Sequence, residues 1–254
     1  MNTRKNQLQA FERLLDIMDE LREKCPWDRK QTMETLRTLS IEEIYELSDA
    51  IIEKDSDEIK KELGDVFLHL VFYAKIASEQ NQFDVADVLN SICDKLIHRH
   101  PHIYGDVEAN TEEQVLQNWE QIKLKEGNKS VLSGVPTSLP AMVKAYRIQD
   151  KVKGVGFEFE NSEQVFEKIQ EEIIEFKEDQ NPTDKEMEFG DILFSLINYG
   201  RFVGINSEDA LERSNKKFIS RFQKLEEIVK ENGQEMGDLT LSELEKLWNL
   251  AKIR

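Results

Sequence analysis

Two stretches decide the fold of this 254-residue chain: ELGDVFLHL at residues 62–70 and EFGDILFSL at residues 188–196. Each follows an acidic stretch of one pattern, EEIYE at residues 42–46 and EEIIE at residues 171–175. A Glu-apolar-Gly-Asp block is rare by chance, and here it occurs twice after the same acidic pattern. The two copies therefore indicate a duplicated module.

The match between the two copies continues downstream of these blocks. Each copy has an Asp that precedes a Lys by eight residues and an Arg by twelve. These residues are Asp87, Lys95 and Arg99 in the first copy, and Asp209, Lys217 and Arg221 in the second. The agreement in spacing supports a duplication of a long segment rather than of one short motif.

Apolar residues recur at intervals of three and four along most of the chain, the spacing of one helix face. No stretch shows the alternation that is typical of a β-strand. We therefore expect an all-α fold built of two tandem four-helix modules. Residues 127–140, rich in Gly, Ser and Pro, are expected to link an N-terminal module at 1–126 to a C-terminal module at 141–254.

Capping residues predict where several helices begin. Ser40 stands three residues before Glu43, and Thr183 three before Glu186, so each pair fits a capping box. A further helix is expected over residues 57–77, which carry a regular apolar stripe. Glu43 accordingly has two alternative roles, as a capping partner of Ser40 or as a member of an acidic cluster.

The charge balance limits the classes of partner. There are 34 Lys and Arg residues against 51 Asp and Glu residues, a net charge of −17, which disfavours nonspecific nucleic-acid binding. No segment has the roughly 18 uncharged residues of a membrane span, and the polar N-terminus does not resemble a signal peptide. A cytoplasmic protein is expected, with Cys25 and Cys93 as reduced thiols.

The acidic residues have the spacing of a metal site. Residues three or four apart share a helix face, so two such pairs meet when their helices form an antiparallel hairpin. Four converging carboxylates raise each other's pKa unless a cation lies between them, and an all-oxygen cluster suits Mg²⁺ or Mn²⁺. The candidate ligands are Glu43, Glu46, Glu62 and Asp65 in the first copy, and Glu172, Glu175, Glu188 and Asp191 in the second.

The alternative for these acids is a solvated helix face. About one residue in five is acidic here, so a single EExxE pattern is weak evidence for a metal site. The second block of each copy is stronger evidence, because it is rarer. We expect the glycines of these blocks, Gly64 and Gly190, to permit close approach of the helices near the metal.

Basic residues accompany the second acidic cluster. Lys168 lies four residues before Glu172, and Lys185 three before Glu188. The first copy has Leu39 and the apolar Ile59 at the matching positions. The second copy is thus better equipped to bind a polyphosphate, which carboxylate-bound metal and nearby cations would hold together.

The chain resembles the MazG family of nucleoside triphosphate pyrophosphohydrolases over nearly its whole length. The resemblance rests on CPWDRKQT at residues 25–32, KLIHRHPHIYGDV at 95–107, NWEQIK at 118–123, GVPTSLPAMVKAYRIQDK at 134–151 and VGFEFE at 155–160. It implies an Mg²⁺-dependent enzyme, usually a homodimer, that cleaves many ribo- and deoxynucleoside triphosphates to a monophosphate and pyrophosphate. A housekeeping role in the nucleotide pool is implied in the same way.

The resemblance also assigns roles to individual residues. The family's metal-binding carboxylates fall on Glu172, Glu175, Glu188 and Asp191, and its nucleotide-contacting residues on Lys168, Lys185, Lys217, Arg221, Trp248 and Lys123. Glu172 is the candidate to activate the attacking water. The first copy is expected to be catalytically weak, as is common in this family.

Two other functions remain open at this point. One is a pyrophosphatase of the same superfamily that selects dUTP or dCTP through a discriminating base pocket. The other is a non-catalytic helical module that binds a protein partner, for which the acidic patches would be solvated surface. Pyrophosphate release measured across a panel of nucleotides would reveal the base-specific enzyme, and an assay of Mg²⁺-dependent turnover separates the non-catalytic module from both enzymes.

Overall fold

The computed structural model describes residues 2–111, 114–115, 118–119, 122 and 130–252. The described residues form helices and contain no strand, which confirms the all-α prediction. The chain divides into two compact units, Met1–Asn110 and Thr111–Arg254. The expected linker at 127–140 begins outside the described residues, and its described part contains the short 3₁₀ helix η2 (Val131–Gly134).

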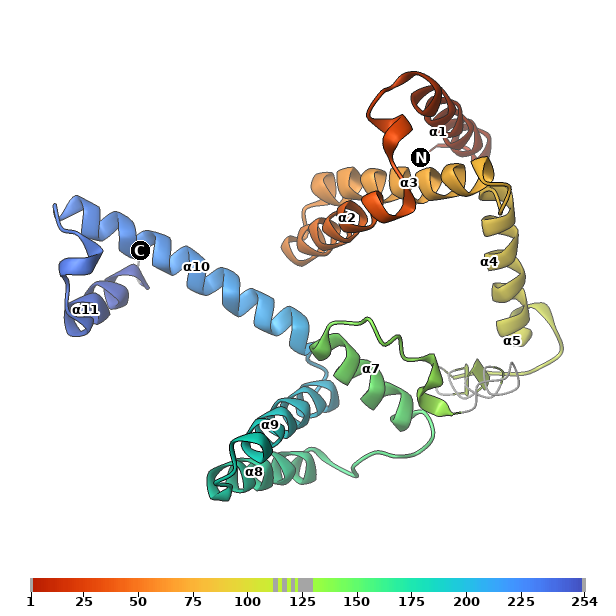
Figure 1. Ribbon diagram of the computed structural model, residues 1–254. Helices are drawn as coiled ribbons and strands as arrows, with labels where there is room; N and C mark the ends of the chain where they lie inside the picture. The colour runs from red at the N-terminus through yellow and green to blue at the C-terminus, as the bar shows by residue number, and fades with distance from the viewer. Residues whose placement is uncertain (1, 112–113, 116–117, 120–121, 123–129, 253–254) are drawn as a thin grey trace. The chain divides into compact units, whose positions relative to one another are not determined.

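The first unit is built around a hairpin of two long helices. Figure 1 shows α2 and α3 side by side, in orange, with α1 packed on α3. Met18, Leu36 and Phe72 are almost fully buried in the core that these three helices share. The elements of this unit are α1 (Arg4–Lys24), the 3₁₀ helix η1 (Asp28–Lys30), α2 (Met33–Glu53), α3 (Ser56–Glu79), α4 (Val85–Arg99) and α5 (Pro101–Tyr104).

The second unit repeats the hairpin and adds a long helix. In Figure 1, α8 and α9 lie side by side, and α11 folds back onto the far end of α10. α10 and α11 have a hydrophobic core of their own, formed by Leu225, Ile228, Val229 and Ala251. Besides η2, the elements are α7 (Ala141–Lys153), α8 (Ser162–Glu178), α9 (Pro182–Phe202), α10 (Ser207–Glu231), the 3₁₀ helix η3 (Met236–Asp238) and α11 (Leu241–Ala251).

The expected helix start at Ser40 is wrong. α2 begins a full two turns earlier, where the Thr32 side chain accepts a hydrogen bond from the backbone N–H of Thr35. Ser40 lies inside α2, and its hydroxyl donates to the Leu36 carbonyl oxygen, 2.9 Å away. Thr32 caps the helix because it follows the η1 turn directly, so Glu43 is left free of any capping role.

The expected capping box of Thr183 and Glu186 is also wrong. Asn181 is the N-cap of α9, and its side-chain oxygen accepts from the backbone N–H of Thr183 at 3.2 Å. Pro182 follows as the first helical residue, where its fixed φ fits a helix and its missing N–H is not needed. The helix therefore begins one residue before Thr183.

The glycines of the two hairpins do not mark a close helix contact. A Cβ atom added at Gly64 or Gly190 would meet no other atom within 4 Å, so the expected close approach is wrong. Gly200 is different, because a Cβ there would lie 2.6 Å from the Ser207 hydroxyl oxygen. Close packing in the second unit thus requires glycine where α9 ends and α10 begins.

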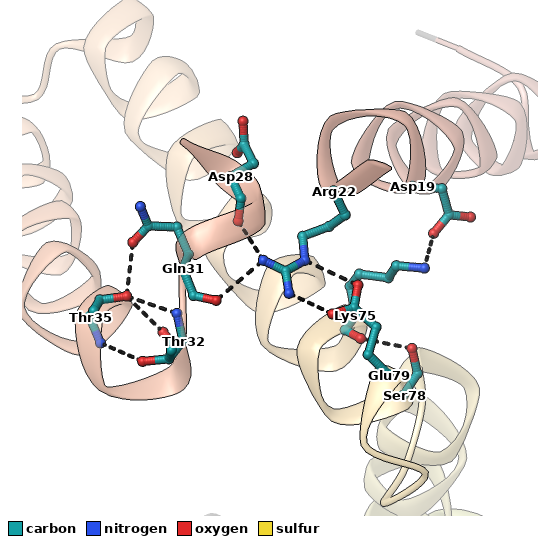
Figure 2. Close-up of polar contacts among 9 residues, drawn as sticks. All are labelled: Asp19, Arg22, Asp28, Gln31, Thr32, Thr35, Lys75, Ser78 and Glu79. Atoms are coloured by element: carbon teal, nitrogen blue, oxygen red, sulfur yellow. Dashed lines mark hydrogen bonds and ion pairs between the residues drawn. The ribbon is translucent and has the colours of Figure 1, made fainter. Parts of the chain in front are cut away.

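Arg22 fixes the segment that connects α1 to α2. Its guanidinium donates to the backbone oxygens of Asp28 and Gln31, the latter at 3.2 Å, as Figure 2 shows. The same group pairs with the Glu79 carboxylate on α3, with Nε to Oε1 at 3.0 Å. One half-buried cation therefore ties two backbone carbonyls of this segment to α3, which gives the CPWD segment a structural role.

Two further features concern the cysteines and the character of the helices. Cys25 and Cys93 are both free. Within the described part of the chain, no helix combines the length and the apolar character that crossing a bilayer requires.

Candidate functional site

Three carboxylates from two helices meet in the second unit. Glu172 on α8 and Glu188 and Asp191 on α9 each place a carboxylate oxygen within 4.8 Å of the others. Glu172 is buried, Glu188 is half-buried and Asp191 is exposed. The cluster therefore runs from the interior of the hairpin to its surface, as expected for a site that solutes reach from one side.

The first unit forms a matching cluster. Glu43 on α2 and Glu62 and Asp65 on α3 also place carboxylate oxygens within 4.8 Å of one another. Each hairpin thus brings together three of the four acids that the helical spacing predicted as metal ligands. Glu46 and Glu175, the remaining predicted ligands, are exposed and lie outside these two groups.

Burial and mutual repulsion raise the pKa of one acid in each cluster. Loss of hydration, followed by the charges of Asp191 and Glu172, raises the pKa of Glu188. Loss of hydration, followed by the charge of Asp65, raises the pKa of Glu43 in the same way. A cation placed among these oxygens would favour their charged forms and relieve the repulsion.

A lysine contacts the buried carboxylate of each cluster. The Lys168 Nζ lies 2.8 Å from Glu172 Oε1, and this contact is the main cause that raises the pKa of the ammonium group. In the first unit, the Lys61 Nζ lies 2.7 Å from Glu62 Oε1. Lys61 gives no signal when matching positions of the two copies are compared, because it comes from the second helix of its hairpin, whereas Lys168 comes from the first.

The other predicted substrate contacts lie on different parts of the fold. The Lys185 Nζ lies 5.0 Å from the centre of the Phe176 ring. Lys217 and Arg221 are on α10, and Trp248 on α11 packs 5.2 Å from the Phe218 ring. Lys123 lies outside the described residues. Their contacts with substrate stay predictions.

A cavity of about 490 Å³ adjoins the second cluster. Its wall includes Lys168, Glu172 and Asp191, so the cluster forms one side of it. The rest of the lining is mainly apolar and comes from α7, α9 and residues 156–159. The apolar members are Ile148, Val152, Phe157, Phe159 and Phe194. The two aromatic residues in VGFEFE are the sequence signal that could have pointed to it.

Comparison with known proteins identifies the family. A family model described as the MazG nucleotide pyrophosphohydrolase domain matches residues 31–104. The chain is 44% identical over 247 residues to the nucleoside triphosphate pyrophosphohydrolase/pyrophosphatase MazG of Thermotoga maritima, with 95% of each chain covered. The chain belongs to the MazG family. It is a nucleoside triphosphate pyrophosphohydrolase by this relationship.

A second relative matches this chain over nearly the whole length of both proteins. The chain is 40% identical over 257 residues to the nucleoside triphosphate pyrophosphohydrolase of Escherichia coli, covering 96% of this chain and 98% of that one. A crystal structure of a MazG-related protein from Thermotoga maritima aligns with 44% of this chain and 98% of its own, at 29% identity and a TM-score of 0.41. The two relatives from Thermotoga maritima and Escherichia coli that match nearly the whole chain confirm the resemblance to the MazG family.

Proposed function

We propose that this MazG-family enzyme hydrolyses a broad range of ribo- and deoxynucleoside triphosphates to a monophosphate and pyrophosphate in an Mg²⁺-dependent reaction. The observation that carries the proposal is the position of Glu172, Glu188 and Asp191, which converge from two helices beside Lys168 and a ligand-sized cavity. A non-catalytic binding module is disfavoured, because the family's described activity is pyrophosphohydrolysis.

The donor set suits a hard divalent cation. Each of the three ligands is a carboxylate oxygen, which matches Mg²⁺, or Mn²⁺ in its place, better than softer metals. Glu175 is exposed and lies three residues after Glu172 on the same face of α8, so it is proposed as a fourth ligand. When bound, such an ion neutralises charge on the phosphates and favours attack by water at phosphorus.

The protein's own residues orient the phosphates. Lys168, held by Glu172 and by Glu171 at 2.9 Å, keeps a fixed positive charge at the edge of the cluster. Such a charge stabilises an anion that develops during hydrolysis without any reorganisation of the site. Lys185, Lys217, Arg221, Trp248 and Lys123 are proposed as further substrate contacts, and Glu172 as the group that activates water.

The proposed domain roles follow from the duplication. We assign most of the turnover to a C-terminal module at 141–254, joined by residues 127–140 to an N-terminal module at 1–126. The N-terminal cluster of Glu43, Glu62 and Asp65, with Glu46 beside it, is proposed to bind metal with little turnover.

The enzyme is further proposed to act as a homodimer. Both hairpins expose large apolar side chains that a monomer leaves in water, and a second copy is a suitable cover for them. They include Ile44 and Tyr45 on α2, Phe67 and Leu70 on α3, Ile174 on α8, and Met187 and Leu193 on α9. Light scattering should give about twice the chain mass of 29.7 kDa, and a strict monomer would contradict the proposal.

Product analysis across a panel of triphosphates tests the activity. The expected result is one pyrophosphate and one monophosphate per substrate for ribo- and deoxynucleotides alike. Chelation should abolish the release, and Mg²⁺ or Mn²⁺ should restore it. Activity that survives chelation would contradict the metal proposal, and turnover of dUTP or dCTP alone would establish the base-specific alternative.

A further inference from the structure

We propose that the cavity between α7, α8 and α9 receives the nucleoside part of the substrate, with its base held against Phe157, Phe159 and Phe194. This inference rests on the proposed function and extends it to the other end of the substrate. It names the residues that would contact the base. The carboxylates and Lys168 would contact the phosphates at the other end of the same substrate.

The position of the cavity links the two ends of one substrate molecule. Lys168, Glu172 and Asp191 belong both to the cavity wall and to the proposed phosphate site. A molecule whose phosphates contact these three residues therefore has its uncharged end at the cavity. The volume of about 490 Å³ lies within the roughly 300–1,000 Å³ of small-ligand sites.

The lining has the chemistry that a base requires. Phe157 is 80% exposed, which is unusual for an aromatic side chain unless something covers it. Phe159 and Phe194 line the same cavity from the 156–159 segment and from α9. Aromatic rings bind the face of any base, so such a wall accepts purines and pyrimidines with little distinction.

The polar residues of the wall are largely engaged with one another. Arg201 donates to Glu158 Oε1 at 2.7 Å and to Asn198 Oδ1 at 2.8 Å. Gln149, which is almost fully buried, donates through its side-chain amide to the Phe194 backbone oxygen at 2.9 Å. Residues of α7, α9 and the 156–159 segment are thereby fixed around the cavity.

Three polar atoms of this wall are buried without a hydrogen-bond partner among the described residues. They are Gln149 Oε1, Glu158 Oε2 and Arg201 Nε. Buried polar atoms in native proteins normally have a protein, water or ligand partner, so an incomplete set marks a site that another molecule completes. Because the set contains both acceptors and a donor, no single base is selected.

The Arg201–Glu158 pair positions the aromatic segment. Gly156 has φ +87°, a backbone conformation that favours glycine and lets the chain turn into Phe157. Glu158, between the two phenylalanines, is held to α9 by Arg201, whose side chain is only 6% exposed. Loss of this pair should loosen both rings while leaving the carboxylate cluster in place.

Equilibrium binding separates the base end from the phosphate end. With Mg²⁺ present, we compare the Kd of α,β-methylene-ATP, an ATP analogue that the proposed reaction cannot cleave, with that of inorganic tripolyphosphate, which has no base. The proteins compared are the wild type, Phe157→Ala and Phe159→Ala. The expected result is a Kd of the ATP analogue raised about tenfold and an unchanged tripolyphosphate Kd. Phe166→Ala is the control, because this α8 ring is 48% exposed but is absent from the cavity lining.

An unchanged Kd of the ATP analogue in both variants, or an equal weakening of the analogue and of tripolyphosphate, would overturn the inference. Failure of the proposed function looks different, because it would be ATP binding without release of pyrophosphate by the wild type. Such binding still tests the cavity through the same pair of dissociation constants.

A charge exchange tests the positioning role. Glu158→Gln should raise KM for ATP about threefold with kcat nearly unchanged, as for loss of uniform binding. The double variant Glu158→Arg with Arg201→Glu should restore part of the loss. Equal losses in kcat and kcat/KM for Glu158→Gln, without rescue by the exchange, would contradict the positioning role.

Discussion

The α2–α3 and α8–α9 hairpins form the same carboxylate cluster in different surroundings. In the first, the cation at the buried carboxylate is Lys61, which precedes Glu62 on α3. In the second it is Lys168, which comes from α8, one turn before Glu172. The two copies of the acidic motif therefore share the three carboxylates, whereas the lysine that accompanies them comes from a different helix in each copy.

The segment before each hairpin shows a second difference. In the first unit, Arg22 holds backbone carbonyls of the connecting segment, which fixes the segment itself. In the second unit, Arg201 holds the side chain of Glu158, and the neighbouring Phe157 remains exposed beside a cavity. The surroundings of the two clusters therefore differ more than the carboxylates themselves do.

The largest expected effect divides the two clusters by activity. Asp191→Ala and Glu175→Ala should lower pyrophosphate release by about a thousandfold or more, because the charge on the polyphosphate loses its metal-bound stabilisation. Asp65→Ala and Glu46→Ala should leave most of the activity. Initial rates for the four folded variants at saturating Mg²⁺ measure this, and the opposite ranking would move the working site to the first unit.

Substitutions of Lys168 and Lys61 should differ in their effect on activity, but by less than substitutions in the two carboxylate clusters. Lys168→Met should reduce kcat/KM about a hundredfold, because it removes a fixed cation at the proposed phosphate site. Lys61→Met, the matched control, contacts the other cluster and should change kcat/KM by less than about twofold. A comparable loss in both variants would show that the first cluster also takes part in turnover.

The glycines give a stability test in both hairpins. Gly64→Ala and Gly190→Ala should each raise the free energy of unfolding by about 1 kcal/mol, because alanine favours a helix and its Cβ has space. Gly200→Ala should lower it, because its Cβ would meet the Ser207 hydroxyl. Denaturant titration measures all three. Destabilisation by Gly190→Ala would indicate a contact made in an assembled form.

The smallest expected effect concerns the Arg22 clamp. Glu79→Gln should lower the free energy of unfolding at pH 7 by up to about 1 kcal/mol, a modest value because the carboxylate is 36% exposed. The hydrogen bond from Arg22 lowers the Glu79 pKa below 4.5, so its stabilisation is complete above pH 4.5.

This stabilisation is lost as pH falls through the folded-state pKa of Glu79. The wild type and Glu79→Gln should therefore converge in acid, which urea titrations at several pH values would show. A constant difference at all pH values would mean that the substitution acts through packing rather than through the charge.

Helix faces could be predicted from the sequence, whereas contacts between distant segments could not. The three-residue spacing of Glu62 and Asp65 places both on one face of α3, and the hairpin brings Glu43 to them. Two predicted helix starts were wrong, because Thr32 directly follows the η1 turn and Asn181 directly precedes Pro182, so both helices begin before the residues chosen.

The cavity at the second cluster and the lysine at the first cluster could be identified only from the structure. Arg201 reaches Glu158 across 43 positions of sequence, and no local pattern encodes such a pair. Lys61 stands beside Glu62 in the sequence, but a lysine among many lysines gives no local signal of contact with a buried carboxylate. Tertiary packing decided both features.

The separate core of α10 and α11 has a consequence for local unfolding. Leu225, Ile228, Val229 and Ala251 pack with one another, while Phe218 and Ile219, which lie nearer the middle of α10, are more than half exposed. Amide hydrogens at the two ends of α10 therefore belong to different cooperative units. Exchange with deuterium should protect the end near α11 together with α11 itself, and leave the exposed middle turns of α10 as the first part of that helix to open.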